Sequence, residues 1–313
     1  MTEKIYVKDI AEGTEVDSLF LIKRADLRAK HGEQYIHLTI ADKTGFTEAK
    51  LYGENAPAAA RSIKTGSVYR IIGKAVIPPN GELYVFSDAK KSLDAVLAGP
   101  AFLGAGELIE YIYTPADIKG NALEIQKIVA SITNPGLKMF VACLLDNRFY
   151  ECPAAIRRHH EYTGGLCEHS LETARIALAM VDNMQRTKIS RDMVIAGAVL
   201  HDIGKIFCFD KTQAGYVPND TYNLVEHLTM GIMYIEEYKN LITEDQLMQI
   251  RHIIQSHHGT YGDVIPLTAE AWLVHHADTA SSAMRSVVDD LETIPAGQKK
   301  KGLHSDKFLW KAV

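Results

Sequence analysis

Histidine and aspartate residues of the types that bind metal ions are concentrated in one part of the chain. Ten of the 13 histidines lie between His159 and His276. Imidazole and carboxylate groups together hold divalent cations, and histidine is also a general acid or base near neutral pH. Any single histidine is more often a packing or surface residue, so the prediction of a metal site depends on the whole set. Its seven members are His169, His201, Asp202, His227, His257, His258 and Asp278.

These candidate ligands fall at the ends and on the faces of predicted helices. From about residue 120 the apolar spacing has a period of 3.6, which predicts helices at 122–132, 135–146, 167–184, 191–200, 224–238, 243–256 and 268–291. His201 and Asp202 follow one apolar run, and His257 and His258 follow another. At a helix end the chain can turn two adjacent side chains toward one ion. An aspartate can also bridge two ions with its two oxygens.

The order of these residues resembles that of the HD-domain metal-dependent phosphohydrolase superfamily. The segment His201-Asp-Ile-Gly-Lys205 matches its H-D-x-x-K signature. The resemblance implies a first metal site made by His169, His201, Asp202 and Asp278. It also implies that Asp202 bridges to a second ion, held by His227, His257 and His258.

The same resemblance implies catalytic roles for Asp202, Lys205 and His160. Lys205 would offset phosphate charge, and His160 would hold the phosphate or protonate the leaving oxygen. One or two divalent ions per chain are expected, with Mn favoured by the resemblance. Histidine and carboxylate ligands also suit Fe, Co, Ni or catalytic Zn, whereas a ligand set without cysteine disfavours a structural zinc site.

The N-terminal part of the chain predicts an all-β domain. Strands are expected at 16–23, 34–41, 46–52, 66–77 and 82–86, with a helix at 56–63 between the third and fourth. This is the order of an OB-fold barrel, and residues 34–45 and 49–52 resemble the OB-folds of nucleic-acid-binding enzymes. Such barrels stack bases on aromatic rings within a basic groove, although each candidate here can instead fill the barrel interior. The candidates are Tyr35, His37, Phe46, Lys50, Tyr52 and Arg70.

The predicted organisation is therefore multidomain, an all-β OB-fold barrel followed by an all-α HD domain. We expect the barrel at 1–92, a linker at 93–120, the HD domain at 121–292 and a basic tail at 293–313. The net charge of −5 argues, for the whole chain, against a nucleic-acid-binding protein. Divided, it is +2 for residues 1–92, −11 for 93–292 and +4 for 293–313. The total therefore hides two basic parts.

The domain order, and the segment from Pro153 to His169, resemble the YhaM-type 3′–5′ exoribonucleases. This resemblance implies hydrolysis of single-stranded RNA, with single-stranded DNA as a further substrate, to 5′-mononucleotides by metal-activated attack on the terminal phosphodiester. It is compatible with a homo-oligomer. Two alternatives remain: an HD phosphodiesterase acting on nucleotides or cyclic dinucleotides, and a non-catalytic single-strand-binding factor. The seven metal-ligand positions argue against the last.

Other features predict a cytoplasmic protein. The four cysteines are scattered, which indicates reduced thiols. No apolar run is long enough to span a membrane, and the first residues lack the apolar core of a signal peptide. The tail combines Lys299–Lys301 with Phe308–Trp310. It can contact RNA or a neighbouring subunit, or remain a mobile solvated segment.

Overall fold

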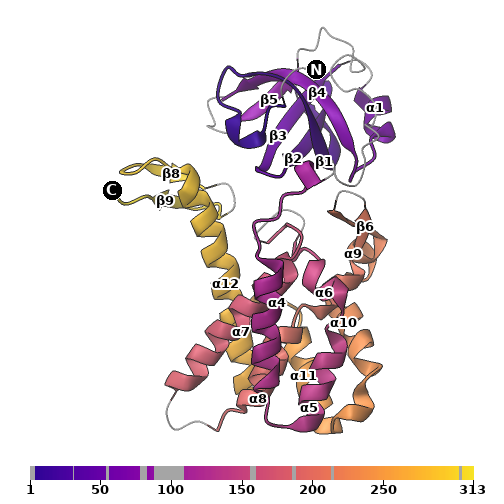
Figure 1. The fold of residues 1–313 in the computed structure, drawn as a ribbon, viewed down its shortest axis with the longest axis vertical. Coiled ribbons are helices and arrows are strands. Elements are labelled where there is room, and N and C mark those ends of the chain that lie inside the picture. The colour runs from indigo at the N-terminus through magenta and orange to yellow at the C-terminus, as the bar shows by residue number, and fades with distance from the viewer. Residues whose placement is uncertain are drawn as a thin grey trace. The chain divides into compact units, whose positions relative to one another are not determined.

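The computed structural model describes residues 4–30, 32–53, 56–77, 83–87, 109–155, 160–184, 188–212, 215–302 and 305–313. Its contacts divide the chain into two compact units (Figure 1). Unit 1 contains Met1–Thr114 and Lys211–Val217, and unit 2 contains Pro115–Asp210 and Pro218–Val313. The segment between the strands expected at 66–77 and 82–86, and most of the expected linker, lie outside the described residues. Among those described, no helix combines the length and apolar character that a bilayer crossing requires.

Unit 1 is a closed five-stranded barrel, as predicted. Its strands run in the order β1-β2-β3-β5-β4, and β1 pairs antiparallel with both β2 and β4. β3 and β5 are parallel, which closes the barrel. The short helix α1 precedes β4. The bounds are β1 Glu15–Lys30, β2 Glu33–Asp42, β3 Gly45–Tyr52, α1 Ala56–Ser62, β4 Val68–Val76 and β5 Tyr84–Ser87.

Alternation in the middle of the strands separates the barrel core from the opposite face. In β2 the side chains of Ile36, Leu38 and Ile40 are fully buried. The residues between them point to the other face, because successive side chains in a strand alternate. Each buried aliphatic side chain contributes about 1.5–3 kcal/mol relative to an exposed one. The register of β2, and with it the choice of outward residues, is therefore fixed by the core.

Unit 2 is helical and carries one small β-ribbon after its last helix, whereas most of a second small ribbon, at 209–218, is assigned to unit 1. Its longer helices are α4 (Ile118–Ala130), α5 (Pro135–Leu144), α7 (Gly165–Asn183), α8 (Arg191–Leu200), α10 (Glu226–Glu236), α11 (Glu244–Ser256) and α12 (Ala269–Thr293). Shorter elements are η2 (Ile109–Tyr111) in unit 1 and α6 (Asn147–Glu151), η3 (Ile203–Phe207), α9 (Asp220–Leu224), η4 (Lys239–Leu241) and η5 (Gly259–Tyr261) in unit 2. The helix predicted at 191–200 has these bounds in the structure, and the capping box of Thr243 and Gln246 is present.

Helix α8 lies in the middle of unit 2 and carries the start of the site. Every residue from Met193 to Leu200 is buried, because this helix is apolar on all sides. It packs against α7, α11 and α12. His201 and Asp202 follow directly, so the chain delivers them into the interior of the unit.

The structure differs from the sequence prediction in several places, and β1, for example, runs to Lys30 although a strand is expected only at 16–23. The helix expected at 224–238 is α10, which begins at Glu226, and a separate short helix, α9, ends just before it at Leu224, because the chain breaks at Val225 and Glu226 adopts a φ of 66°. The segment 121–292, expected to be all-α, also contains the paired short strands β6 (Phe209–Thr212) and β7 (Gly215–Pro218), and in the expected tail β8 (Lys299–Lys301) pairs with β9 (Phe308–Trp310). The tail, for which a mobile segment is one expectation, therefore forms an antiparallel ribbon.

Candidate metal centre

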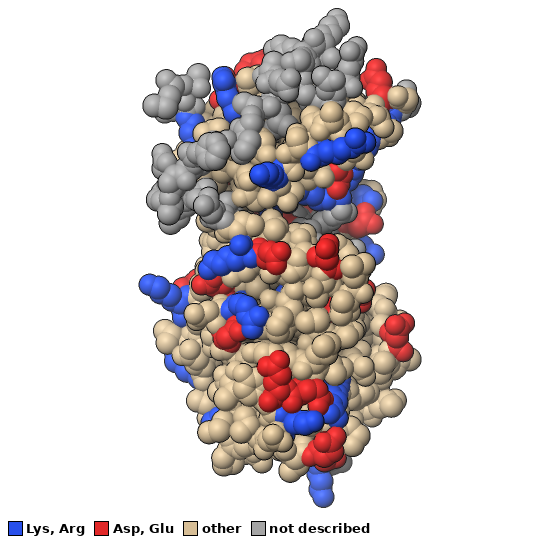
Figure 2. All heavy atoms as spheres, turned by 90° about the vertical axis from the view of Figure 1, so that its right-hand side faces the viewer, with Lys and Arg blue, Asp and Glu red and all other residues tan. Residues whose placement is uncertain are grey.

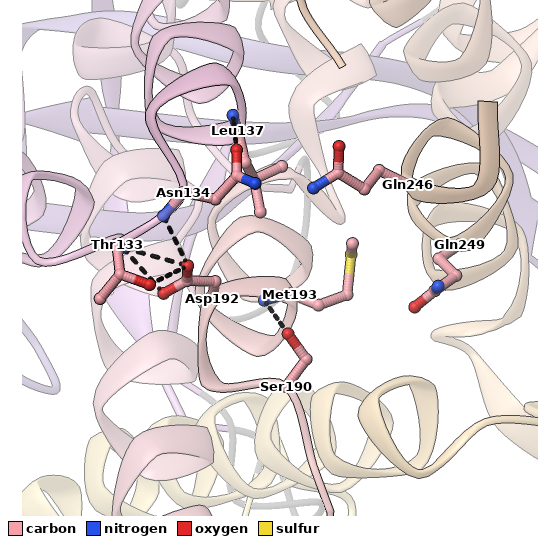
Figure 3. A pocket seen from close by; sticks show the side chains of 8 residues that line it. All are labelled: Thr133, Asn134, Leu137, Ser190, Asp192, Met193, Gln246 and Gln249. Atoms are coloured by element: carbon pink, nitrogen blue, oxygen red, sulfur yellow. Dashed lines mark hydrogen bonds between the residues drawn. The ribbon is translucent and has the colours of Figure 1, made fainter. Parts of the chain in front are cut away.

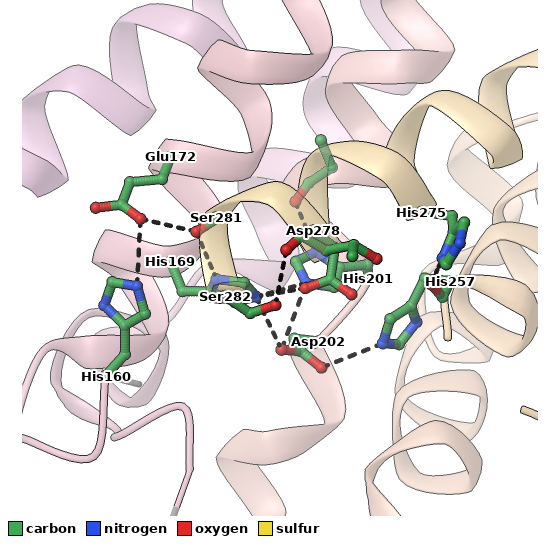
Figure 4. A network of polar contacts seen from close by, with 12 residues as sticks. His160, His169, Glu172, His201, Asp202, His257, His275, Asp278, Ser281 and Ser282 are labelled. Atoms are coloured by element: carbon green, nitrogen blue, oxygen red, sulfur yellow. Dashed lines mark hydrogen bonds and ion pairs between the residues drawn. The ribbon is translucent and has the colours of Figure 1, made fainter. Parts of the chain in front are cut away.

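Asp202 lies at the centre of the predicted ligands, and its two oxygens face different groups of side chains (Figure 4). Its side chain is 2% exposed. Oδ2 is 3.6 Å from His169 Nε2 and 3.4 Å from His201 Nε2. Oδ1 is 3.3 Å from His227 Nε2 and 3.6 Å from His257 Nε2. One carboxylate therefore faces two half-sites.

The first half-site joins three helices. His169 comes from α7, His201 from the C-terminal end of α8 and Asp278 from α12. His169 Nε2 lies 3.1 Å from Asp278 Oδ1 and 3.2 Å from His201 Nε2. One ligand atom from each of the three lies within 4.8 Å of the others, which is close enough to share one ion.

The second half-site uses residues at the start of α10 and the end of α11. Ligand atoms of His227, His257 and His258 lie within 4.8 Å of one another. The ring centroids of His227 and His258 are 5.3 Å apart. His201, Asp202 and His257 form a third such group, so the two half-sites are continuous through Asp202. The structure thus brings all seven predicted ligands together.

Hydrogen bonds on the far side of the rings orient three of the histidines. Nδ1 of His201 lies 2.9 Å from the carbonyl oxygen of Ala198, and Nδ1 of His257 lies 2.8 Å from that of Ile254. A carbonyl only accepts, so each Nδ1 carries the proton and donates it. The Nε2 lone pair then points toward Asp202. This is how proteins fix the tautomer of metal-binding histidines.

His169 is oriented by side chains instead of the backbone. Its Nδ1 lies 3.1 Å from Ser281 Oγ, and that hydroxyl donates to Glu172 Oε2 at 2.7 Å (Figure 4). Ser281 therefore has an accepting lone pair for the His169 N–H. The chain His169–Ser281–Glu172 ends on a carboxylate, which strengthens the basicity of the imidazole. Sequence reasoning missed Ser281 and Glu172. Their only signal is helical spacing, since Glu172 follows His169, and Ser281 follows Asp278, by three residues.

The chemistry of the donor set fits a divalent cation. Asp202 Oδ1 and His227 Nε2 are buried and make no hydrogen bond within the described part of the chain. Buried polar atoms without a partner are costly, and an ion between them would satisfy both. Imidazole and carboxylate ligands suit Mn, Fe, Co, Ni or Zn. No residue of the set is a cysteine.

Electrostatics hold the carboxylates ionised. Burial opposes ionisation of Asp202, but nearby Lys205 and His201 outweigh it, so the pKa of Asp202 lies well below its usual value. The pKa of Asp278 is lowered in the same way, against burial, by its hydrogen bond to His169. Burial lowers the pKa of His227 to about 3 and that of His257 well below its usual value. Ionised carboxylates and neutral imidazoles are the protonation states that bind metal.

Lys205 and His160, the other predicted catalytic residues, both lie near the cluster. Lys205 Nζ is 2.5 Å from Asp202 Oδ2. His160 is buried, with Nδ1 3.1 Å from Glu168 Oε2 and Nε2 3.2 Å from Glu172 Oε2. Burial lowers the pKa of His160, but the two carboxylates outweigh it and the net shift is upward. Both ring nitrogens of His160 therefore face protein carboxylates in this structure.

The outer face of β2, β3 and β5 collects four of the six predicted nucleic-acid contacts. Tyr35 and Tyr52 stack with their ring centroids 4.8 Å apart, and Tyr52 continues to Phe86 at 5.4 Å. Lys50 Nζ lies 3.7 Å above the Tyr84 ring. His37, the neighbour of Lys50 across the strands, pairs with Glu48. This face of an OB barrel is one that binds oligonucleotides. Tyr84 and Phe86 were missed, although they alternate with the buried Val85.

The other two predicted contacts lie elsewhere on the barrel. Arg70 is on β4, where Nε and Nη2 each contact an oxygen of Asp17 at 2.6 Å. Phe46 lies at the far end of β3 from Tyr52, beside Lys23 and Tyr113. The structure therefore does not bring Arg70 or Phe46 together with the Tyr35–Tyr52 stack.

A cavity of about 410 Å³ in unit 2 is separate from the cluster (Figure 3). It lies between the start of α5, the start of α8 and α11. Asp192, its one carboxylate, accepts hydrogen bonds from the backbone N–H groups of Thr133 and Asn134. That carboxylate therefore serves as a structural cap. Its lining residues are Thr133, Asn134, Leu137, Ser190, Asp192, Met193, Gln246 and Gln249.

All four cysteines are free thiols, as the sequence predicts. Cys143 is exposed and the other three are buried. Burial raises the pKa of Cys152 and of Cys167 to about 12 and that of Cys208 to about 11. These three are therefore neutral at physiological pH and behave as small apolar residues.

Comparison with known proteins confirms the predicted fold classes. A family model described as an HD domain matches residues 166–283, and one described as an OB-fold nucleic acid binding domain matches residues 21–89. The chain therefore combines an OB-fold domain with an HD domain. Every member of the metal cluster lies within the first match.

Individual relatives divide between full-length and partial similarity. The chain is 25% identical to the 3′-5′ exoribonuclease YhaM of Listeria monocytogenes over 305 residues, covering 93% of this chain and 92% of that protein. Its identity to YhaM of Bacillus velezensis is also 25%, covering 91% of this chain and 90% of that protein. The dihydroneopterin 2′,3′-cyclic phosphate phosphodiesterase of Methanocaldococcus jannaschii is 36% identical over 167 residues, covering 52% of this chain and 63% of that protein. The resemblance to YhaM-type proteins thus extends through both domains.

Proposed function

We propose that this protein is a metal-dependent 3′–5′ exoribonuclease that degrades single-stranded RNA to 5′-mononucleotides. The observation that carries the proposal is the combination in one chain of a seven-ligand His/Asp centre and an aromatic face on an OB barrel. Similarity to the YhaM proteins along both domains supports it. A small-molecule phosphodiesterase has no need of an oligonucleotide-binding face.

The ligand residues would hold two divalent ions. His169, His201 and Asp278 supply the first half-site, and His227, His257 and His258 the second, with Asp202 shared between them. When bound, such ions supply Lewis acidity that acidifies water and neutralises charge on the phosphoryl group. Mn is the ion we favour, on the resemblance to YhaM-type proteins.

The remaining residues would position this machinery. Lys205 holds Asp202 in place and adds positive charge beside the phosphoryl oxygens. His160 faces Glu168 and Glu172 with both nitrogens, so we assign it to the support of Glu172 and through it of His169. Direct contact of His160 with the phosphate or with the leaving oxygen stays a prediction from the resemblance.

A second candidate is a phosphodiesterase acting on a small cyclic phosphate or nucleotide. The 36% identity to the M. jannaschii phosphodiesterase favours it, and that similarity is limited to about half of this chain. The same metal ligands serve both reactions, so the metal centre does not discriminate between them. The surface that binds the substrate is what would discriminate between the two candidates.

One experiment separates the two candidates. The purified protein with Mn²⁺ is incubated with 5′-labelled single-stranded RNA, single-stranded DNA, a 2′,3′-cyclic nucleotide and a cyclic dinucleotide. We expect a ladder of RNA products shortened from the 3′ end, together with 5′-mononucleotides. Intact RNA beside hydrolysed cyclic phosphates would contradict the proposal.

The Asp202→Asn variant tests the metal assignment in the same assay. It should lose hydrolysis and most Mn²⁺ binding, because it removes the carboxylate shared by both half-sites. Asp182→Asn, which changes a half-exposed carboxylate outside the centre, is the matched control and should behave as the native protein. Full activity of Asp202→Asn would show that the ligands are misassigned.

A further inference from the structure

The ribbon formed by β8 and β9 has one face that combines basic and aromatic side chains. Lys299 pairs with Trp310, and Lys301 pairs with Phe308. Cross-strand partners share a face, and residues two apart on a strand do so too. These four side chains therefore lie together, whereas Lys300 and Leu309 point to the opposite face. The position of Lys299 Nζ, 5.4 Å from the Phe308 ring centroid, agrees with this assignment.

Two large rings on this face are open to solvent. Phe308 is 68% exposed and Trp310 is 61% exposed. The three lysines of β8 are exposed as well. Asp306, the one acidic residue of the tail, forms an ion pair with Lys301 at 2.5 Å, which leaves the tail with a net charge of +4.

The ribbon is anchored to the helix that precedes it. Asp290 on α12 is 1% exposed, and its carboxylate accepts a hydrogen bond from the Ser305 backbone N–H at 2.8 Å. The N–H of Gly302 donates to the carbonyl of Lys307, and that of Gly297 to the carbonyl of Lys311. The aromatic and basic face is thus held at the C-terminal end of α12 (Figure 1).

We propose that this face of the ribbon binds single-stranded RNA, stacking bases on Phe308 and Trp310 and placing phosphates near Lys299 and Lys301. Single-strand sites combine exposed aromatic rings with basic side chains in this way. The tail that contains the ribbon carries a net charge of +4, whereas residues 93–292 carry −11. The face of unit 2 seen in Figure 2 mixes both signs of charge. Aromatic residues are enriched in protein–protein interfaces but lysine is depleted there, so the three lysines of β8 favour RNA over a subunit contact. The inference rests on the proposed function, because it extends the same substrate beyond the OB barrel.

Fluorescence of Trp310 tests the contact directly. The chain has two tryptophans, so Trp272→Phe leaves Trp310 as the sole emitter. In an Asp202→Asn background, which keeps the RNA intact, titration with a 20-nucleotide oligo(U) should quench this emission. Emission that stays unchanged at saturating RNA would overturn the proposal.

Affinity variants give the second test, by fluorescence anisotropy of labelled oligo(U). Phe308→Ala and Trp310→Ala should each weaken binding at least about fivefold, from the usual effect of removing one stacked ring. Lys299→Ala should weaken binding more than Lys300→Ala, which removes the same charge from the opposite face. The double aromatic variant combines Phe308→Ala with Trp310→Ala. If it bound oligo(U) with the same affinity as the parent protein, the proposal would be contradicted.

Two further measurements keep the outcomes distinct. Degradation of RNA by the native chain is measured first, so failure of the proposed function would appear as intact RNA in that reaction. The double aromatic variant should keep the native rate on bis(p-nitrophenyl) phosphate, because the metal centre is unchanged. If the double aromatic variant had a changed sedimentation coefficient and an unchanged RNA affinity, the ribbon would be a subunit interface and the proposal would be overturned.

Discussion

At the scale of single residues, the metal centre depends on hydrogen bonds that face away from it. His201 and His257 use backbone carbonyls that the helices supply automatically, three residues earlier in each case. His169 depends on a serine and a glutamate from two different helices. Its orientation is therefore the one most open to change by mutation.

We predict that Ser281→Ala lowers the affinity for Mn²⁺ by about 10- to 100-fold, the usual effect of removing such a support. The His169 N–H loses its acceptor, so the ring can turn its Nε2 away from Asp202. Isothermal titration with Mn²⁺ measures the change. Ser282→Ala is the control, because the Ser282 hydroxyl bonds only to the Thr279 carbonyl among the contacts described. Equal affinities of the two variants would refute this role.

The buried thiols predict a loss of stability at alkaline pH. The folded-state pKa of about 12 for Cys152 and Cys167 lies above the ordinary value of 9.0. Their contribution is therefore fully present below pH 9 and is lost as the pH rises toward 12. The urea midpoint of reduced protein should fall between pH 9 and pH 10.5, and should fall less in Cys152→Ala. An equal fall of the urea midpoint in the native protein and in Cys152→Ala would show that the Cys152 thiol is not the cause.

At the scale of elements, the ligands meet because several helices end at one place. α8 and α11 are each capped by a histidine, and the next candidate ligand, Asp202 or His258, is the N-cap of the short 3-10 helix that follows. Two glycines permit the close approach. A Cβ on Gly204 would lie 1.9 Å from the His227 carbonyl oxygen, and one on Gly259 would lie 2.2 Å from the His275 ring.

We predict that Gly204→Ala destabilises unit 2 by about 3 kcal/mol, at the upper end for overpacking, because backbone must move. The shift separates η3 from α10 and carries His227 away from Asp202, so Mn²⁺ affinity should fall as well. Chemical denaturation and metal titration measure the two effects. Gly231→Ala is the matched control, since its nearest neighbour would be 3.4 Å away. Similar losses in both variants would argue against this steric account.

At the scale of the whole molecule, the aromatic face of the barrel and the cluster of candidate metal ligands belong to different units. The outer face of β2, β3 and β5 offers stacked rings and Lys50, whereas the ionisable ligands all lie in unit 2. Binding of RNA and cleavage of a phosphodiester should therefore be separable by mutation.

We predict that Tyr52→Ala weakens RNA binding about 5- to 100-fold, from the loss of a stacked ring, and leaves hydrolysis of bis(p-nitrophenyl) phosphate unchanged. Lys50→Ala should weaken RNA binding by a smaller factor. Lys74→Ala, which removes an exposed lysine of β4 paired with Glu15, serves as the charge control and should have little effect. Anisotropy with labelled RNA measures all three. Losses of equal size in Lys50→Ala and Lys74→Ala would mean that the barrel binds by general charge alone.

The sequence by itself determined the two fold classes, the order of the barrel strands and the seven residues that cluster around Asp202. Period-2 and period-3.6 apolar patterns are local properties, and seven ligand residues in a fixed order leave few alternatives. Only the tertiary structure showed which residues support the ligands and which aromatics share a face. Ser281 meets His169 across 112 residues, and Phe86 meets Tyr52 through a parallel strand pair. Such contacts are set by packing between distant segments, and no local pattern encodes them. For the same reason Arg70, a sound candidate by residue type, is found paired with Asp17 on another part of the barrel.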